Sequence, residues 1–240
     1  MIVAAAGRGG RLGPGAPKAL RLLAGEPLLV HAVRSLAAAR SVDVLVVAAP
    51  PDAVSEVRAL LADFVPDRVG LVVVAGGSSR QDSVRLALAV LPDDVDVVLV
   101  HDAARCLVPA ALVESVVAAV RAGADAVVPG TPVADTVKRV DDGRVVETVD
   151  RSALRGAQTP QGFSRVVLMA AHQAAELDGA GPATDDAGLV ERMGGPVVLV
   201  PGSEEAFKVT RPIDLLLAEA LLAERALLAN RSEPAERGGR

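Results

Sequence analysis

Residues 3–18, VAAAGRGGRLGPGAPK, are the stretch that decides the fold of this chain. The apolar run Ile2–Ala6 predicts a buried strand, and it ends in a glycine-rich loop along which Arg11 and Lys18 are spaced. Glycine lets backbone N–H groups come close to a ligand, and arginine and lysine supply positive charge for phosphate groups. The first acidic residue is Glu26, although the whole chain has a net charge of −5. The opening therefore indicates a polyphosphate site at the carboxyl end of a strand.

The composition predicts a soluble α/β enzyme of the cytoplasm. Of the 240 residues, 51% are hydrophobic but only 1% are aromatic, so valine, leucine, isoleucine and alanine must fill the core. No apolar run approaches the ~20 residues that span a bilayer, and no basic segment typical of a secretory signal precedes the first strand. The single cysteine, Cys106, excludes an intramolecular disulfide and fits a reducing compartment. An acidic chain without Trp or Tyr argues against a nucleic-acid partner.

Strand patterns and helix patterns alternate along the chain. Apolar runs typical of strands buried on both faces occur at residues 2–6, 42–48, 69–74, 95–100, 126–128 and 197–200. Helical patterns occur at residues 28–40, 53–63, 82–90, 110–122, 164–177, 184–193 and 213–228. This order predicts an α/β fold with a doubly wound, mostly parallel, Rossmann-like sheet. Ligands of such folds bind beyond the carboxyl ends of the strands, so functional residues are expected in the loops there.

The alternation breaks at residues 131–151. Asp135–Val140 and Arg144–Val149 flank an Asp-Asp-Gly turn, a pattern that predicts a β-hairpin. The segment has too little apolar content to form its own core, so it is either a surface hairpin or an arm that packs on a second subunit. We expect a single domain over residues 1–228 that carries this insertion, followed by a flexible tail at 229–240.

Further polar motifs follow the predicted strands, and each also has a purely structural interpretation. Residues 76–83, GGSSRQDS, are suited to contact a planar base, or else Asp82 or Ser83 only caps the next helix. In residues 101–105, HDAAR, Asp102 is a suitable ligand for Mg²⁺, or else it forms an ion pair with an arginine that ties down the loop. Three more motifs are equally explained as a charged hairpin end, a polar loop and a helix start: TVDR at 148–151, QTPQ at 158–161 and FKVTRP at 207–212.

Together with DTVKRV at 135–140 and TDDA at 184–187, these motifs resemble, in order and spacing, the 2-C-methyl-D-erythritol 4-phosphate cytidylyltransferase family over roughly residues 1–228. The resemblance implies a doubly wound fold and a homodimer, with residues 131–151 as a protruding β-arm for dimerisation. It also implies a nucleotidyltransferase that joins CTP and methylerythritol phosphate, releases pyrophosphate and uses Mg²⁺, in non-mevalonate isoprenoid biosynthesis. Cys106 and Ala206 depart from the family pattern, which usually has proline and asparagine there.

The resemblance also implies roles for individual residues. Arg11 and Lys18 would hold the triphosphate and stabilise charge on its α-phosphate, while Arg151 and Lys208 would aim the phosphate of the second substrate. The residues that would contact CTP are Ala5, Ala6, Gly7, Gly77, Ser83 and Asp102, of which Asp102 would also hold the metal. The residues that would contact the second substrate are Arg105, Thr136, Arg151, Thr184 and Lys208.

The chemistry of the implied reaction fits the residues present, and the sequence lacks the motifs of two competing classes of nucleotide-binding protein. A phosphate is already an anionic nucleophile, so the reaction needs positioned cations and no general base. His31 and His172 are accordingly expected to be packed or solvated within helices, and His101 to support the turn at Asp102. Leu12 stands where a dinucleotide dehydrogenase needs its third glycine, and no Gly-Lys-Ser/Thr of a P-loop follows. A ribitol 5-phosphate cytidylyltransferase and a non-catalytic nucleotide-binding module remain as alternatives.

Overall fold

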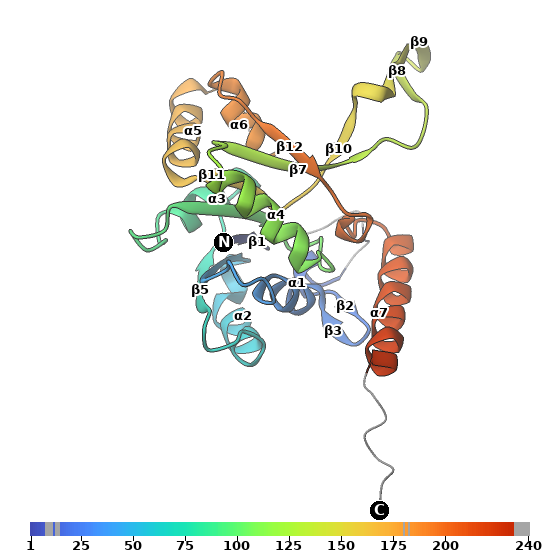
Figure 1. Cartoon of the computed structure of the whole chain (residues 1–240). Coiled ribbons are helices and arrows are strands. Elements are labelled where there is room, and N and C mark those ends of the chain that lie inside the picture. Colours follow the sequence, from blue (N-terminus) through green and yellow to red (C-terminus); the bar gives the residue numbers. More distant parts are fainter. Residues whose placement is uncertain (8–11, 13–14, 180, 182, 233–240) are drawn as a thin grey trace, which may run out of the picture.

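A single mixed sheet forms the centre of the computed structural model, which describes residues 1–7, 12, 15–179, 181 and 183–232 (Figure 1). Its strands follow the order β10-β7-β11-β6-β1-β4-β5, and β12 pairs with β7 outside this path. Strands β1, β4, β5 and β6 pair in parallel, as do β7 and β12, which confirms the mostly parallel α/β sheet. The bounds are β1 (Ile2–Ala4), β4 (Val44–Ala49), β5 (Gly70–Ala75), β6 (Val97–Asp102), β7 (Ala126–Pro132), β10 (Arg155–Ala157), β11 (Gln161–Ser164) and β12 (Val198–Pro201).

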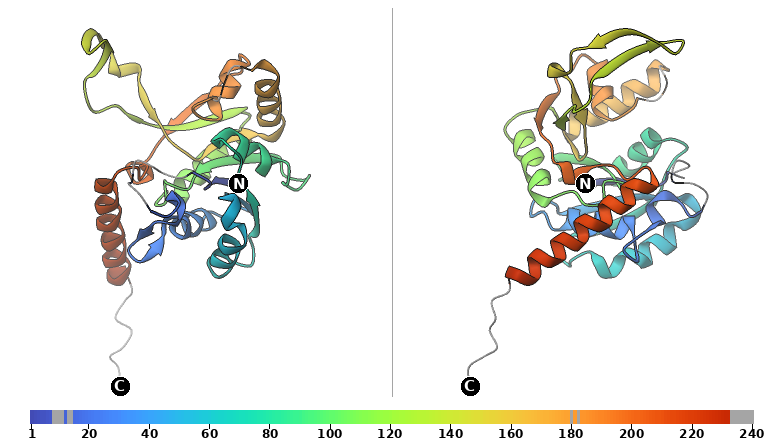
Figure 2. Two further views of the ribbon diagram at one scale, coloured as in Figure 1. Left: turned by 180° about the vertical axis from the view of Figure 1, so that it is seen from behind. Right: turned by 90° about the vertical axis from the view of Figure 1, so that its right-hand side faces the viewer.

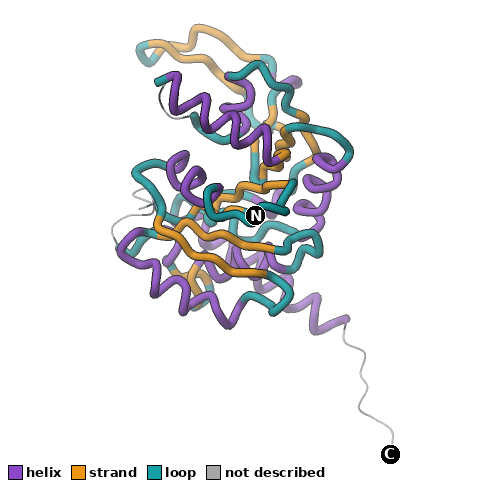
Figure 3. The backbone as a smooth tube through the Cα atoms, turned by 90° about the vertical axis from the view of Figure 1, so that its left-hand side faces the viewer, coloured by secondary structure: helices purple, strands orange, loops and turns teal. Residues whose placement is uncertain are grey.

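Alternate side chains of the strands enter two cores on opposite faces of the sheet. On β1, Val3 packs into the cluster formed with α1 (Leu28–Ala37), α2 (Val54–Leu61) and α4 (Ala110–Arg121). Its neighbour Ile2 packs into the cluster formed with α3 (Arg80–Leu88), α5 (Arg165–Asp178) and α6 (Ala187–Arg192). Neither side chain is exposed. Helices therefore cover both faces of the sheet, and Figure 3 shows the orange strands between purple helices, the doubly wound arrangement that the sequence predicts.

The sequence-based prediction did not include strands β10 and β11, which flank the polar loop that it placed at residues 158–161; only the last residue of that loop, Gln161, belongs to a strand. β11 lies between β6 and β7 and pairs antiparallel with both, while β10 pairs antiparallel with β7. The β11 segment has one large apolar side chain, Phe163, so no apolar run marks it as a strand. A Cβ on Gly162 would lie 2.5 Å from Val116 of α4, so glycine is needed for the helix to pack here. Pairing from both sides, not local pattern, makes this segment a strand.

The bounds of three helices also differ from the prediction. α3 begins two residues early, at Arg80, because its cap is Ser79, whose Oγ accepts from the backbone N–H of Asp82 at 3.0 Å. The short helix α6 begins at Ala187, three residues later than predicted. The last helix, α7 (Pro212–Ser232), extends into the expected tail, while residues 233–240 lie outside the described part. None of the helices in the described ranges is long and apolar enough to cross a membrane.

A small hairpin and several short helices complete the body. β2 (Leu22–Leu23) and β3 (Glu26–Pro27) pair antiparallel, and α7 packs beside them through a third apolar cluster that includes Leu23 and Ala218. Figure 2 shows α7 as a long red helix along the side of the molecule. The 3-10 helices are η2 (Lys18–Leu20), η3 (Pro51–Ala53), η4 (Ala62–Phe64), η5 (Arg151–Ala153) and η6 (Glu204–Ala206).

The predicted hairpin is present and stands away from the body of the molecule (Figures 1 and 2). Its strands β8 (Val137–Asp141) and β9 (Arg144–Val149) pair antiparallel, and Asp142 and Gly143 have the positive φ values, 42° and 73°, that the tight turn requires. The hairpin has no apolar core among the described residues: its valines at positions 140, 145 and 146 are 56–60% exposed. A thin hairpin of this kind is marginally stable alone, so a second surface is expected to support it.

Candidate active site

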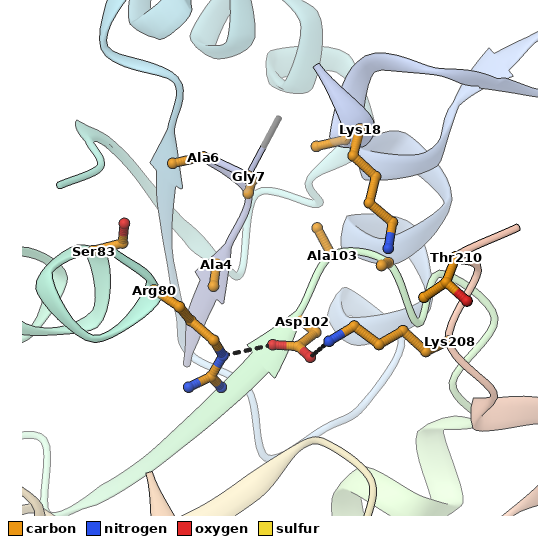
Figure 4. A pocket seen from close by; sticks show the side chains of 13 residues that line it. Ala4, Ala6, Gly7, Lys18, Arg80, Ser83, Asp102, Ala103, Lys208 and Thr210 are labelled. Carbon is orange, nitrogen blue, oxygen red and sulfur yellow. Dashed lines mark hydrogen bonds and ion pairs between the residues drawn. The ribbon is translucent and has the colours of Figure 1, made fainter. Parts of the chain in front are cut away.

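The site lies where β1 and β6 end side by side, because Ala4 is in register with Asp102. The loop that follows β1 closes where the backbone N–H of Lys18 donates to the carbonyl of Gly7 at 3.3 Å. A cavity of about 240 Å³ opens at this edge of the sheet. Of the residues predicted from the sequence, those that line it are Ala5, Ala6, Gly7, Lys18, Ser83, Asp102 and Lys208 (Figure 4).

Asp102 is the centre of the polar wall of this cavity. Its Oδ1 accepts from Arg80 Nε at 2.8 Å and its Oδ2 from Lys208 Nζ at 2.6 Å, the two dashed contacts in Figure 4. Burial alone would raise the pKa of Asp102, but the charges of Arg80 and Lys208 hold that pKa well below its ordinary value. The carboxyl group is therefore ionised at neutral pH. An ion pair with an arginine does tie down this loop, but the partner is Arg80 and not the Arg105 of the same motif.

The HDAAR loop is fixed from beneath by buried polar contacts. The backbone N–H of Asp102 donates to Thr159 Oγ1 at 3.1 Å, and this oxygen lies 3.2 Å from His101 Nδ1. The other ring nitrogen of His101 lies 3.1 Å from the carbonyl of Arg105. Burial lowers the pKa of His101 to about 4, so the ring is neutral at physiological pH. His101 thus supports the turn at Asp102, as predicted.

The glycine loop after β5 packs against the loop after β1. A Cβ on Gly76 would lie 2.4 Å from the Cβ of Ala6, and one on Gly77 would lie 2.3 Å from the Cβ of Asp82. The backbone N–H of Gly77 donates to Ser83 Oγ at 3.0 Å, which makes Ser83 an internal brace of the loop as well as a wall of the cavity. Gly7 differs, because a Cβ there would meet no atom of the described residues within 4 Å. The space suited to a ligand is beside Gly7, whereas Gly76 and Gly77 are explained by loop packing.

Two lysines reach the cavity from different parts of the chain. Lys18 begins η2, and Lys208 lies in the segment between η6 and α7. The neighbour of Lys208, Val209, donates its backbone N–H to the carbonyl of Ala104 at 2.8 Å, which pins this segment to the HDAAR loop. Figure 4 shows both lysine side chains extending toward the cavity that Asp102 faces. The cavity is therefore bordered by separate cations around one carboxylate.

A second cavity, of about 230 Å³, adjoins the first and shares Arg80, Asp102 and Lys208 with it. Two further predicted residues, Arg105 and Thr184, line this second cavity. The remaining residues of its lining are Ala157, Gln158, Thr159, Gln161 and Asp185. Arg105 and Thr184, which the sequence analysis assigns to a different substrate from CTP, therefore line a different cavity from Gly7 and Lys18.

The guanidinium of Arg105 donates two hydrogen bonds to backbone carbonyls of the fold. Its Nη1 donates to the carbonyl of Ala206 at 2.7 Å and its Nη2 to the carbonyl of Ala157 at 3.0 Å. Burial lowers its pKa from the ordinary value for arginine. The side chain therefore ties the end of β10 and η6 to the floor of the second cavity, and its Nε is buried without a hydrogen-bond partner among the described residues.

The structure does not bring every predicted residue to these cavities. Thr136 and Arg151 lie on the exposed arm, where Arg151 Nη1 donates to the carbonyl of Ala134. Gly77 lies in the wall-forming loop but is not part of the lining. Arg11 lies outside the described residues.

Sequence reasoning missed Arg80, which lines both cavities, and Asp186, to which Arg80 is also bonded. The signal for each was present in a motif already noted. Arg80 is part of GGSSRQDS and Asp186 of TDDA, but their contacts join residues 22 and 106 positions apart. His31 and His172 are packed, with exposures of 6% and 3%, as expected.

Known proteins match the chain along nearly all of its length. A sequence profile described as 2-C-methyl-D-erythritol 4-phosphate cytidylyltransferase matches residues 1–224. The protein of that name from Streptomyces avermitilis is 56% identical over 234 residues, which cover 94% of this chain and 92% of the relative. The one from Frankia casuarinae is 58% identical over 92% of this chain and 80% of the relative. The crystal structure of the Thermus thermophilus protein is 37% identical, with a TM-score of 0.75 over 92% of this chain and 98% of its own. The chain therefore belongs to the 2-C-methyl-D-erythritol 4-phosphate cytidylyltransferase family.

Proposed function

We propose that this chain transfers the cytidylyl group of CTP to 2-C-methyl-D-erythritol 4-phosphate and releases pyrophosphate, in non-mevalonate isoprenoid precursor biosynthesis. The observation that carries the proposal is that two adjoining cavities share Asp102, Arg80 and Lys208 in their linings and are otherwise lined by different residues. A transfer between two polyanionic substrates needs such a meeting point, because catalysis of phosphoryl-type transfer consists mainly of positioning and charge stabilisation. Family membership supports the same reaction.

The first cavity is suited to CTP and the second to the polyol phosphate. The open space beside Gly7, with Ala5, Ala6 and Ser83 around it, would receive the cytidine part, and Gly77 braces this wall. Lys18, together with Arg11 in the same loop, would hold the triphosphate. In the second cavity Arg105 and Thr184 would contact the polyol phosphate, and Lys208, which borders both cavities, would aim its phosphate.

In this arrangement the work of the protein is electrostatic. The phosphate oxygen of the polyol attacks the α-phosphorus of CTP while the bond from that phosphorus to the pyrophosphate oxygen breaks. Lys18 offsets the charge that develops on the α-phosphate. Lys208 holds the attacking phosphate close to the triphosphate despite the electrostatic repulsion between the two anions. No proton has to be abstracted, and the one histidine beside Asp102 is buried and neutral. The site thus needs cations at fixed positions and no general base.

Asp102 is the side chain suited to hold Mg²⁺, which would neutralise part of the charge of the triphosphate. The fit is that of a substrate-borne ion: Mg²⁺ commonly takes one or two carboxylates plus substrate phosphates. Among the described residues no group of three or more His, Cys, Asp or Glu side chains is placed to hold a metal. Each oxygen of Asp102 already accepts from one cation and has a second lone pair, so a metal would share the carboxylate with Arg80 and Lys208.

Weak binding of Mg²⁺ to the free protein is the expected result of this arrangement. Calorimetric titration of Mg²⁺ into the protein alone should give little heat, and the same titration with a CTP analogue that resists transfer should give a defined binding isotherm. Asp102→Asn should weaken the second isotherm, because a neutral amide is a poorer ligand for a hard cation. Tight binding of Mg²⁺ to the free protein would contradict this assignment.

Release of pyrophosphate from CTP, measured with each of two acceptors, tests the proposed function. We expect methylerythritol phosphate to support turnover and ribitol 5-phosphate to support at least tenfold less, a discrimination typical of a site that hydrogen-bonds its substrate. Faster turnover with ribitol 5-phosphate would replace the proposed acceptor. Binding of CTP with no turnover on either acceptor would instead assign the chain to the non-catalytic nucleotide-binding class.

We also propose a homodimer in which the arm reaches the second cavity of a partner subunit. Its exposed valines need a surface to cover them, and the two predicted residues that it carries, Thr136 and Arg151, are displaced from the cavities of their own chain. A two-fold dimer would then hold two equivalent composite sites. The only cysteine, Cys106, is buried and its pKa is raised by burial to about 12, which suits a reducing cytoplasm as the place of action.

A further inference from the structure

A chain of ion pairs runs from Asp102 into the interior of the molecule. Arg80 contacts Asp102 through Nε at 2.8 Å and Asp186 through Nη1 at 2.6 Å. Asp186 Oδ1 in turn lies 3.1 Å from His172 Nε2. The side chains of Asp186 and His172 are only 1% and 3% exposed, so neither reaches a substrate. Any effect of Asp186 on the reaction must therefore pass through Arg80.

The guanidinium of Arg80 is divided between two carboxylates. An arginine commonly pairs with one carboxylate through two parallel N–H bonds, but Arg80 gives one donor to Asp102 and another to Asp186. Asp102 consequently keeps its second oxygen for Lys208 Nζ, at 2.6 Å. Burial alone would lower the pKa of Arg80, but the charges of Asp186 and Asp102 raise it above the ordinary value, so the group stays charged. Because Arg80 shares its donors between two carboxylates, only one oxygen of Asp102 is held by Arg80 and the other is left for Lys208 at the border of the cavities.

Asp186 is itself fixed by the body of the protein. It directly precedes α6, and the backbone N–H of the next residue, Ala187, donates to Gln161 Oε1 of β11 at 3.1 Å. The side chain of Asp186 contacts His172, on α5, in addition to Arg80. The backbone next to Asp186 is thus anchored to a central strand, and the side chain of Asp186 lies between Arg80 of α3 and His172 of α5. A charge held so rigidly can fix the orientation of a neighbouring guanidinium.

We propose that Asp186 is a positioning residue for the transfer reaction. By holding one edge of the Arg80 guanidinium, it prevents Arg80 from turning both donors onto Asp102, and so keeps the second oxygen of Asp102 on the Lys208 side of the site. Without Asp186, the partly buried charge of Arg80 has Asp102 as its remaining carboxylate partner, and the bidentate pair becomes the favoured geometry. The inference rests on the proposed function, because the effect it assigns to Asp186 is on that reaction.

The variant Asp186→Asn tests this, because it keeps the size of the side chain and removes its charge. We expect kcat per active site to fall about 10- to 100-fold, as for a misplacement of reacting groups by a fraction of an ångström to an ångström. KM for each substrate should stay within about threefold, because the walls of both cavities are unchanged. The number of active sites is counted by calorimetric titration with CTP, so that unfolded protein does not enter kcat.

Glu176→Gln is the matched control. Glu176 pairs with Arg85 at 2.8 Å, and this pair also joins α5 to α3, but on the exposed surface. Its loss should leave kcat unchanged. If the Asp186 contact only fastened helices together, Asp186→Asn would lower the melting temperature and the active fraction, and kcat per active site would stay at the wild-type value.

A double-mutant cycle shows whether Asp186 acts through Arg80. Arg80→Gln alone should lower kcat, and adding Asp186→Asn to it should lower kcat no further. Independent losses that multiply, or a wild-type kcat for Asp186→Asn, would overturn the inference while leaving the proposed function intact. A wild-type protein that transfers nothing would overturn both. Should Asp186→Asn not fold, Arg80→Lys serves instead: one ammonium cannot hold both carboxylates as the fork does, so a wild-type kcat in that variant would likewise overturn the inference.

Discussion

Lys18→Ala is expected to lower turnover by roughly 10²–10³, the usual loss when one donor to a transition-state charge is removed. Lys18 borders the cavity that also contains Asp102 and Lys208, so its ammonium is placed to act on the triphosphate. The loss should fall mainly on kcat and less on KM for CTP, because charge on the α-phosphate grows in the transition state. Steady-state release of pyrophosphate at saturating CTP measures the effect. Arg11→Ala is expected to cause a loss of the same order.

Arg8→Ala is the control for both variants. Arg8 belongs to the same loop, but the resemblance assigns it no role. Its removal takes away one positive charge at a similar place in the sequence and should change turnover by less than about tenfold, since a general field effect is screened by salt. If Arg8→Ala proves as damaging as Lys18→Ala, the roles assigned within this loop are wrong.

Mixing two inactive variants, Lys18→Ala and Arg151→Ala, should restore activity to about a quarter of the wild-type value. In the proposed dimer each site combines Lys18 of one chain with Arg151 of the other. Random exchange of subunits makes half of the dimers mixed, and each mixed dimer contains one site with both residues intact. Activity is followed by release of pyrophosphate during exchange of equal amounts of the two proteins.

The control for this experiment is a mixture of Lys18→Ala with Lys18→Ala,Arg151→Ala, which can form no intact site. Exchange itself is verified with two affinity tags of different kinds. Mixed dimers without recovered activity would show that Arg151 serves its own subunit or no site. A monomer at assay concentrations would rule out the composite site altogether.

The parallel half of the fold could be predicted because each of its strands has a local hydrophobic pattern in the sequence. Strands such as Val44–Ala49 are continuous apolar runs buried on both faces, and the loops that follow two strands of this half, β1 and β6, add Ala5, Ala6, Gly7, Ala103 and Ala104 to the lining of the first cavity. The antiparallel strand β11 could not be predicted in this way. Its four residues become a strand through neighbours that are distant in sequence, and its single Phe163 gives no period.

The candidate site shows the same division. Asp102, Lys18 and Lys208 were predicted because each belongs to a motif at the end of an element. The pairing of Asp102 with Arg80 and Lys208 was not predicted, because these two residues lie on opposite sides of Asp102 in the sequence and meet it only in the fold. Asp186 was missed for a further reason: a buried carboxylate has no surface signal, and its role depends entirely on which cation it faces.

The wall shared by the two cavities also constrains inhibitor design. A compound that joins a nucleotide-like half to a polyol-phosphate half would occupy both cavities and benefit from the high effective concentration of the second half. Its linker would have to cross beside Asp102, which is ionised and borders both cavities. An anionic linker suits that crossing, because the carboxylate of Asp102 is already paired with Arg80 and Lys208, two cations that also border both cavities and would receive the phosphates of the two substrates. Further acidic groups could be added nearer the ends of such a compound, where Lys18 borders only the first cavity and Arg105 only the second.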